Sequence, residues 1–272
     1  MTDRYALFGN PLGHTKSPFI HGEFARQLGD DISYEAIEAP VDGFAAAVRD
    51  FVKAGGKGFN VTVPFKVEAA ELADEAHEAV VVCGASNCVK VEDGQLVAEN
   101  FDGVGLVRDI VDNLGVALKG RRVLFAGAGG ATRGAVVPFL EAGVGEIVIA
   151  NRTVSKAEAI RDLLGPRGSV QACGYEDISG GFDIVLNSTS ASLSGAALPI
   201  PPAAFEGARL AYEMAYGKGK TPFLELAERS GAERLADGVG MLVEQAAEAF
   251  AWWRGRRPDT APVIEAMTIP LE

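Results

Sequence analysis

The stretch between residues 122 and 150 constrains the fold of this chain more than any other. An apolar run, residues 122–126, leads directly into the glycine-rich sequence GAGGATR at residues 127–133, and a helical pattern follows through Phe139. Gly143 ends that pattern before a second apolar run, residues 146–150. This order predicts a βαβ unit of a parallel sheet, with the glycines between the first strand and its helix. Backbone N–H groups there can approach a pyrophosphate at the positive end of the helix, with a purely structural turn as the alternative.

The residues after the second strand of this unit favour one nicotinamide cofactor over the other. An NAD site usually has Asp or Glu there to hold the ribose hydroxyls, whereas this chain has Asn151, Arg152 and Thr153. A guanidinium beside a hydroxyl suits a 2′-phosphate, so we expect NADP; an arginine that only caps the sheet edge is the alternative. The sequence SKAE at residues 155–158 is typical of a capping box that opens the next helix. The cofactor-binding residues predicted from this unit are Gly127, Ala128, Gly129, Gly130, Ala131, Asn151, Arg152, Thr153 and Lys156.

Composition and charge exclude several classes of protein. With 272 residues, 48% of them hydrophobic, the chain is long enough for two folded domains. The formal net charge of -12 argues against a nucleic-acid partner. The three cysteines are odd in number and match no metal spacing, so we expect free thiols and no metal. No signal peptide is visible and no apolar stretch reaches the ~18–20 residues of a membrane span, which predicts a soluble, cytoplasmic protein.

Strand and helix signals continue on both sides of the glycine-rich unit. Ser17-Pro18 is typical of a helix start, in which a capping hydroxyl precedes a proline, and Gly29 is a helix stop. The predicted buried stripe of that helix is Phe19, Ile20, Phe24 and Leu28. Asp93-Gly94 between two apolar runs predicts a hairpin over residues 89–98. Further strands are expected at residues 5–8, 59–63, 182–186 and 209–214, a helix capped by Thr221-Pro222, and a long apolar helix over residues 240–253.

Eight segments, in order along nearly the whole chain, resemble those of the shikimate dehydrogenase family. Two of them lie in the N-terminal part, GNPLGHTKSP at residues 9–18 and NVTVPFK at residues 60–66. The others are GASN (84–87), NFDG (100–103), the glycine-rich loop (127–133), NRT (151–153), residues 212–223 and DGVGML (237–242) through Gln245. A single segment of this kind is weak evidence, but eight in register are strong.

The resemblance implies an α/β fold in which an N-terminal substrate domain is completed by C-terminal helices and a Rossmann-type NADP-binding domain is inserted. It places the substrate domain at residues 1–102 and 238–272 and the cofactor domain at 103–237. The activity implied is the reversible, NADPH-dependent reduction of 3-dehydroshikimate to shikimate, a step of aromatic amino-acid biosynthesis. Lys66 and Asp102 match the catalytic pair of the family. The implied substrate-binding residues are Thr15, Ser17, Asn60, Thr62, Asn87, Tyr216 and Gln245, and the further cofactor-side residues are Glu78, Met214 and Gly238.

The chemistry of the catalytic pair agrees with this resemblance. Hydride arriving at a ketone carbon makes an alkoxide, which needs a proton or a cation within ~3 Å. Lysine can supply either, and a neighbouring aspartate can orient it. The alternatives are a solvated surface lysine for Lys66 and a helix N-cap for Asp102. Helix capping is likewise the alternative role for Thr15 and Ser17, and turn and core positions are the alternatives for Asn87 and Tyr216.

Three residues depart from the pattern of the family. Thr15 stands where the family usually has serine, and Cys88 where it has threonine after Asn87. Phe101 replaces the threonine that precedes the catalytic aspartate in the family, and the hydroxyl of that threonine often faces the substrate. We therefore expect weaker or slower handling of shikimate than in relatives with threonine at position 101, unless the ring points away from the substrate.

Two other functions remain open on the sequence alone. One is a related dehydrogenase acting on quinate or a similar hydroxylated cyclohexane carboxylate. The other is a non-catalytic module that senses NADP, against which the retention of both Lys66 and Asp102 argues. We expect a small-molecule substrate, no nucleic-acid or membrane partner, and a monomer or homodimer.

Overall fold

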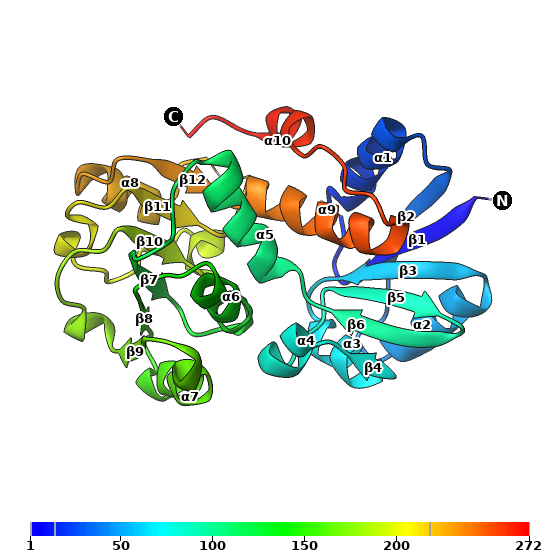
Figure 1. Ribbon diagram of the computed structural model, residues 1–272, viewed down its shortest axis with the longest axis horizontal. Helices are drawn as coiled ribbons and strands as arrows, with labels where there is room; N and C mark the ends of the chain where they lie inside the picture. The colour runs from blue at the N-terminus through cyan, green and yellow to red at the C-terminus, as the bar shows by residue number, and fades with distance from the viewer. Residues whose placement is uncertain (1, 14, 218, 272) are drawn as a thin grey trace. The chain divides into compact units, whose positions relative to one another are not determined.

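The computed structural model describes residues 2–13, 15–217 and 219–271, without the side chains of residues 193 and 194, so His14 of the first motif lies outside the described residues. The chain divides into two compact units (Figure 1). Unit 1 is Met1–Gly105 with Val243–Val263, and unit 2 is Leu106–Leu242 with Ile264–Glu272. Each unit therefore collects segments that are far apart in the sequence.

Unit 1 is built on a mixed sheet with the strand order β2-β1-β3-β5-β6-β4 in the described chain (Figure 1). Strand β1 is parallel to β2 and β3, and β5 is antiparallel to both β3 and β6. The carboxyl ends of β1, β3 and β6 therefore meet the amino end of β5 at one edge of the sheet. The strands are β1 (Asp3–Gly9), β2 (Ile32–Glu38), β3 (Gly56–Val61), β4 (Glu75–Ala76), β5 (Cys88–Glu92) and β6 (Gln95–Glu99).

Aromatic side chains fill the core of unit 1. Phe8 on β1 makes edge-to-face contacts with Phe44, Phe51 and Phe59, at ring-centroid distances of 5.8, 5.7 and 5.2 Å. Trp253 stacks on Tyr5 at 4.7 Å, which holds the C-terminal part of the long apolar helix against β1. Such contacts add to the apolar burial that stabilises the unit. The helices are α1 (Ser17–Leu28), α2 (Phe44–Lys53), α3 (Lys66–Leu72) and α4 (Glu78–Cys83), together with the parts of α5 (Asp102–Arg108) and α9 (Val239–Arg254) that fall in unit 1.

Unit 2 is built on a parallel sheet with the order β12-β11-β10-β7-β8-β9 in the described chain (Figure 1). The order of the strands reverses between β7 and β10, and open parallel sheets bind ligands at the carboxyl ends beside such a reversal. The strands are β7 (Arg122–Ala126), β8 (Glu146–Ala150), β9 (Val170–Cys173), β10 (Ile184–Asn187), β11 (Leu210–Glu213) and β12 (Leu235–Asp237). The helices are α6 (Gly130–Glu141), α7 (Val154–Leu164) and α8 (Pro222–Arg229), while α10 (Ala261–Met267) crosses a unit boundary.

The predicted α/β fold class is confirmed, and several local predictions are confirmed to the residue. Strands β7 and β8 have the bounds read from the apolar runs. The hairpin between β5 and β6 turns at Asp93 and Gly94, both with positive φ. Thr221 caps α8 by accepting a hydrogen bond from the N–H of Leu224, and Gly29 ends α1 in the left-handed conformation. No helix of the described chain is both long and apolar enough to cross a membrane.

Other local predictions are wrong, most of them at helix starts. Ser17 is the first helical residue of α1 and provides no side-chain cap; its N–H instead donates to Thr15 Oγ1. The buried face of α1 includes His21, whereas Phe19 is 46% exposed. Helix α7 begins at Val154, before the predicted capping box. The strand expected at residues 59–63 is β3, which begins at Gly56 and ends at Val61.

Candidate active site

A lysine–aspartate pair lies at the edge of the unit 1 sheet where β3 and β6 end. Lys66 is the first residue of α3, which follows β3, and Asp102 is the first residue of α5, which follows β6. Lys66 Nζ lies 2.6 Å from Asp102 Oδ2, and the side chains are 30% and 19% exposed. Asp102 accepts a hydrogen bond from one of the three N–H groups of the ammonium, so another N–H can donate to a substrate oxygen.

The Asp102 carboxylate is held by neighbours that leave it free of helix capping. The backbone N–H of Asp102 donates to Asn100 Oδ1 at 3.1 Å, so Asn100 satisfies the start of α5. The second carboxylate oxygen, Oδ1, accepts a hydrogen bond from Asn87 Nδ2 at 2.8 Å. The alternative role of Asp102 as a helix N-cap is therefore taken by another side chain.

Asn87 is the centre of this network. Its amide nitrogen also donates to Gln245 Oε1 at 3.1 Å, and its oxygen accepts from the N–H of Phe101 at 2.9 Å. The amide is 2% exposed and its orientation is fixed by donors and acceptors on three sides. Four of the predicted site residues, Lys66, Asp102, Asn87 and Gln245, thus form one connected set within unit 1.

A close approach between two helices makes the contact with Gln245 possible. Gly105 on α5 lies against α9, and a Cβ atom at that position would be 2.7 Å from the backbone nitrogen of Gln245. Any side chain at residue 105 would push the two helices apart. The glycine therefore sets the distance at which Gln245 reaches Asn87.

The network extends to a residue that the sequence analysis did not select. Tyr34 on β2 donates from its hydroxyl to Asn60 Oδ1 at 2.8 Å, and Asn60 Nδ2 donates to the backbone oxygen of Asn87 at 3.2 Å. Burial raises the pKa of Tyr34 well above its usual range, so the hydroxyl remains a donor at neutral pH. Tyr34 sits between the polar residues Ser33 and Glu35, and nothing in its sequence context signals this contact.

The remaining predicted substrate residues lie around this set or in the other unit. Thr15 and Ser17 share a hydroxyl contact of 3.4 Å, and the backbone of Thr62 bonds to Phe8 at the end of β1. Tyr216 belongs to unit 2, where it follows β11 and is 39% exposed. The ring of Phe101 packs edge-on against Trp252 at 5.8 Å.

The glycine-rich loop of unit 2 connects β7 to α6 at the reversal of strand order. Gly127 has φ 117°, and a Cβ atom there would be 2.6 Å from Ser188 Oγ, which follows β10. At Gly129 and Gly130, by contrast, an added Cβ would meet nothing within 4 Å. The backbone at the start of this 12-residue helix is therefore open to a ligand, as phosphate binding requires.

Cationic side chains follow β8 beside this loop. Arg152, Thr153 and Lys156 are all exposed, and among the described residues neither cation has a carboxylate partner. Asn151 donates from Nδ2 to the backbone oxygen of Thr153 at 2.8 Å, which fixes the turn that carries them. The local arrangement suits a phosphate on the ribose, since these cations need not break an ion pair with a described carboxylate in order to bind it.

A buried carboxylate that was not among the predicted site residues organises the loop after β10. Glu213, fully buried at the end of β11, accepts hydrogen bonds from Asn187 Nδ2 at 2.8 Å and from Ser192 and Thr221. Burial raises the pKa of this carboxyl, and these hydrogen bonds oppose the rise. The side-chain oxygen of Asn187 in turn accepts hydrogen bonds from the backbone N–H and the hydroxyl of Thr189. These contacts fix the segment of Ser188 and Thr189, which packs against Gly127.

The three less diagnostic cofactor-side residues are divided between the two units. Met214 and Gly238 are neighbours in unit 2, because a Cβ atom on Gly238 would be 2.2 Å from the backbone oxygen of Met214. Glu78 is the exposed first residue of α4 in unit 1.

A glycine loop at the reversal of a parallel sheet, with a lysine–aspartate pair in a second unit, defines a nicotinamide-dependent dehydrogenase as the class of protein. The family models that match are the shikimate dehydrogenase substrate binding domain (residues 7–89), shikimate / quinate 5-dehydrogenase (106–194) and the shikimate 5'-dehydrogenase C-terminal domain (238–268). A shikimate dehydrogenase (NADP(+)) of Nitrosospira multiformis is 54% identical over 97% of this chain and 96% of its own. The chain belongs to the shikimate dehydrogenase family.

Solved structures agree with this membership. An Ael1 enzyme from Pseudomonas putida is 57% identical, with full coverage of both chains and a TM-score of 0.96. The shikimate 5-dehydrogenase from Thermus thermophilus, solved in complex with NADP(H) and shikimate, is 30% identical with a TM-score of 0.87, and 98% of each chain is covered.

Proposed function

We propose that this chain catalyses the NADP-dependent, reversible reduction of 3-dehydroshikimate to shikimate. The observation that carries the proposal is the Lys66–Asp102 pair at 2.6 Å, held by Asn87 and Gln245, in a chain that is 54% identical to a shikimate dehydrogenase (NADP(+)). We assign substrate binding to unit 1 and cofactor binding to unit 2.

In the reducing direction, the Lys66 ammonium group donates a proton to the oxygen of the ring ketone as that oxygen gains negative charge. Asp102 holds the ammonium group in place and accepts a hydrogen bond from a neighbouring substrate hydroxyl. In the oxidising direction the same lysine, as a neutral amine, accepts the proton of the hydroxyl. Because the two groups are already hydrogen-bonded to each other at 2.6 Å, little reorganisation opposes the reaction.

The polar residues around the pair are suited to a carboxylated, hydroxylated ring. Hydroxyl groups of Thr15 and Ser17 and amides of Asn60, Asn87 and Gln245 offer both donors and acceptors, and Thr62 directly follows β3. Tyr216 is assigned to the substrate by the family pattern alone. Donors in buried or half-buried positions discriminate strongly against ligands that lack the matching group.

The residues of unit 2 fit NADP. Gly127 to Ala131 would hold the pyrophosphate through backbone N–H groups, since the positions of Gly129 and Gly130 are open, and Arg152, Thr153 and Lys156 would hold the 2′-phosphate. Asn151, Met214 and Gly238 of unit 2, and Glu78 of unit 1, are the remaining cofactor-side assignments. When bound, the cofactor supplies or accepts the hydride, and the residues of unit 1 handle the proton.

The experiment is an absorbance assay at the reduced-nicotinamide band with shikimate or quinate, each with NADP or NAD. Shikimate with NADP is expected to give the highest catalytic efficiency. Quinate or a related hydroxylated cyclohexane carboxylate is the second candidate substrate, because the family model that matches residues 106–194 is that of shikimate / quinate 5-dehydrogenase. No turnover in any of the four combinations, with a folded protein, would contradict the proposal. We further propose a cytoplasmic enzyme, monomeric or homodimeric, without a nucleic-acid partner.

A further inference from the structure

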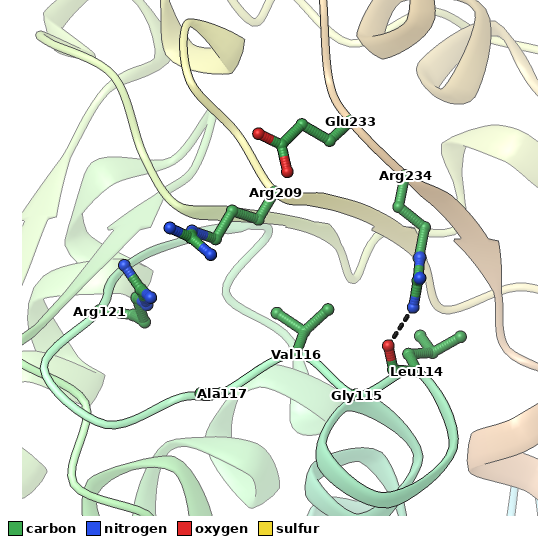
Figure 2. A pocket seen from close by; sticks show the side chains of 8 residues that line it. All are labelled: Leu114, Gly115, Val116, Ala117, Arg121, Arg209, Glu233 and Arg234. Carbon is green, nitrogen blue, oxygen red and sulfur yellow. Dashed lines mark hydrogen bonds between the residues drawn. The ribbon is translucent and has the colours of Figure 1, made fainter.

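A pocket lies in unit 2 (Figure 2). It is at the amino ends of the parallel strands, and therefore on the edge opposite to the glycine-rich loop. Its volume is about 330 Å³, which is within the usual range for small-molecule sites. Loop residues 114–117 form one wall, and the residues that precede strands β7, β11 and β12 form the rest. None of the residues assigned above to substrate or cofactor lines this pocket.

The pocket collects cations because of the strand order. Arg121, Arg209 and Arg234 stand directly before β7, β11 and β12, and Asp183 stands directly before β10. These four strands are neighbours in the order β12-β11-β10-β7, so their first residues form a row with a spacing of about 4.8 Å per strand. This row therefore contains three guanidinium groups and one carboxylate, in a chain whose formal net charge is -12.

The carboxylate of Asp183 leaves much of this positive charge unpaired. It lies 3.0 Å from a terminal nitrogen of Arg121 and 4.0 Å from Nε of Arg209. Nε of Arg121 is buried and has no hydrogen-bond partner in the described chain. Arg234 donates to the backbone oxygen of Leu114 and has no carboxylate partner among the described residues.

The side chains are placed to hold a ligand from two sides. Figure 2 shows the guanidinium groups of Arg121 and Arg209 side by side on one flank and that of Arg234 on the other, with Val116 between them. Leu114, Val116 and Ala117 add apolar surface to the same wall. Glu233 is the one acidic residue among those that line the pocket. Separated cations over an apolar wall are complementary to anionic groups joined by a carbon skeleton.

We propose that this pocket binds a small organic anion that carries at least two carboxylate or phosphate groups. One group pairs with Arg209 and Arg121, and another pairs with Arg234. The charge requirement separates this ligand from the monocarboxylate proposed as substrate. The proposal stands independently of the proposed function, because it concerns other residues and its test requires no turnover.

The test is isothermal titration of the full chain with citrate and with pyrophosphate, at constant ionic strength and with NADP present to occupy the Arg152 edge. Acetate and chloride serve as singly charged controls. We expect citrate or pyrophosphate to bind with a dissociation constant on the order of 1 mM or tighter. The anion that binds more tightly identifies whether carboxylate or phosphate is preferred. If neither binds more tightly than acetate, the proposal is wrong.

Three variants locate the binding. Arg209→Gln and Arg234→Gln should each weaken it at least about tenfold, the loss expected for a charge-assisted contact. Glu233→Gln should tighten it, because the variant removes the acidic residue from the lining. Arg229→Gln is the matched control, since Arg229 lies in the same unit with a 68% exposed side chain paired to Glu225. Equal weakening by Arg229→Gln, or unchanged binding in both pocket variants, would overturn the proposal.

Discussion

The two sites proposed for substrate and cofactor are built in different ways. In unit 1 the functional side chains satisfy one another: Lys66 pairs with Asp102, and Asn87 joins Asp102 to Gln245. In unit 2 the groups at the carboxyl edge are open glycine backbone at Gly129 and Gly130 and exposed cations without carboxylate partners among the described residues. The first site is preorganised for a reaction, whereas the second presents positive charge for a ligand to neutralise. Mutations should therefore affect turnover at the first site and affinity at the second.

The largest effect is expected for Lys66→Ala. Loss of the proton donor should reduce kcat for shikimate oxidation by about 10²–10⁴-fold while shikimate still binds, because the contribution of Lys66 is concentrated in the transition state. Steady-state kinetics together with a shikimate titration measures both quantities. Lys57→Ala is the matched control, since Lys57 is an exposed lysine on the neighbouring β3. Near-native turnover in Lys66→Ala would move the catalytic role to another residue.

Arg152→Gln should act on the cofactor instead. We expect the preference for NADP over NAD, measured as the ratio of kcat/KM values, to fall by about 10–100-fold, the equivalent of one charge-assisted contact or two. Efficiency with NAD should change little. Arg161→Gln provides the control, because Arg161 lies on the following helix and pairs with Asp162. An unchanged ratio in Arg152→Gln would show that the arginine only covers the sheet edge.

The free energy of unfolding of unit 1 should depend on pH through His21. This side chain is fully buried and stacks on Tyr34 at 4.2 Å, and burial lowers its pKa from 6.5 to about 3, with the Asn60 amide opposing the shift. Between pH 6.5 and about pH 3 the imidazole binds a proton only in the unfolded chain. The contribution of His21 to the free energy of unfolding is therefore fully present above pH 6.5 and is lost as the pH falls toward 3. From pH 7 to pH 5 the loss should be about 2 kcal/mol.

Urea unfolding at several pH values, followed by Trp fluorescence, measures this dependence, since both tryptophans lie in unit 1. His21→Phe should remove the part of the slope between pH 5 and 6.5. A slope that is the same in the wild-type chain and in His21→Phe would assign it to other groups.

The smallest effect is expected for Phe101→Thr. The restored hydroxyl should raise kcat/KM for shikimate by up to roughly tenfold, about 1.4 kcal/mol. The contact of the ring with Trp252 works against this gain, because its loss removes packing in the apolar cluster around Tyr5, Cys88 and Trp253. Kinetics with shikimate and a thermal unfolding curve separate the two effects. A folded variant without improvement would mean that the aromatic ring serves packing or another substrate.

Local patterns predicted much of the fold because they depend on neighbouring residues. The bounds of β7 and β8 follow from apolar runs beside glycines, and the turn at Asp93-Gly94 follows from its dipeptide. The capping roles predicted for Ser17 and Ser155 are wrong, because both serines lie inside their helices. The path by which the chain enters a helix decides at which residue the helix begins.

Contacts between distant segments could not be predicted in this way. Asn60, the hydrogen-bond partner of Tyr34, lies 26 residues further along the chain. Asn100, which caps α5, is oriented by a second hydrogen bond from its Nδ2 to the backbone oxygen of Ala85. The arginines of the pocket in unit 2 become neighbours only through the order of the parallel strands. The family resemblance selected Lys66, Asp102, Asn87 and Gln245 together, but their hydrogen bonds emerge only from the fold.

The measurement that tests the central claim most directly is a pair of crossed titrations, with shikimate and NADP each titrated into Lys66→Ala and Arg152→Gln. If unit 1 performs the chemistry and unit 2 selects the cofactor, Lys66→Ala will bind NADP as the wild-type chain does. Arg152→Gln will then bind shikimate normally and NADP about tenfold or more weakly. Comparable losses for both ligands in both variants would contradict this division of roles between the two units.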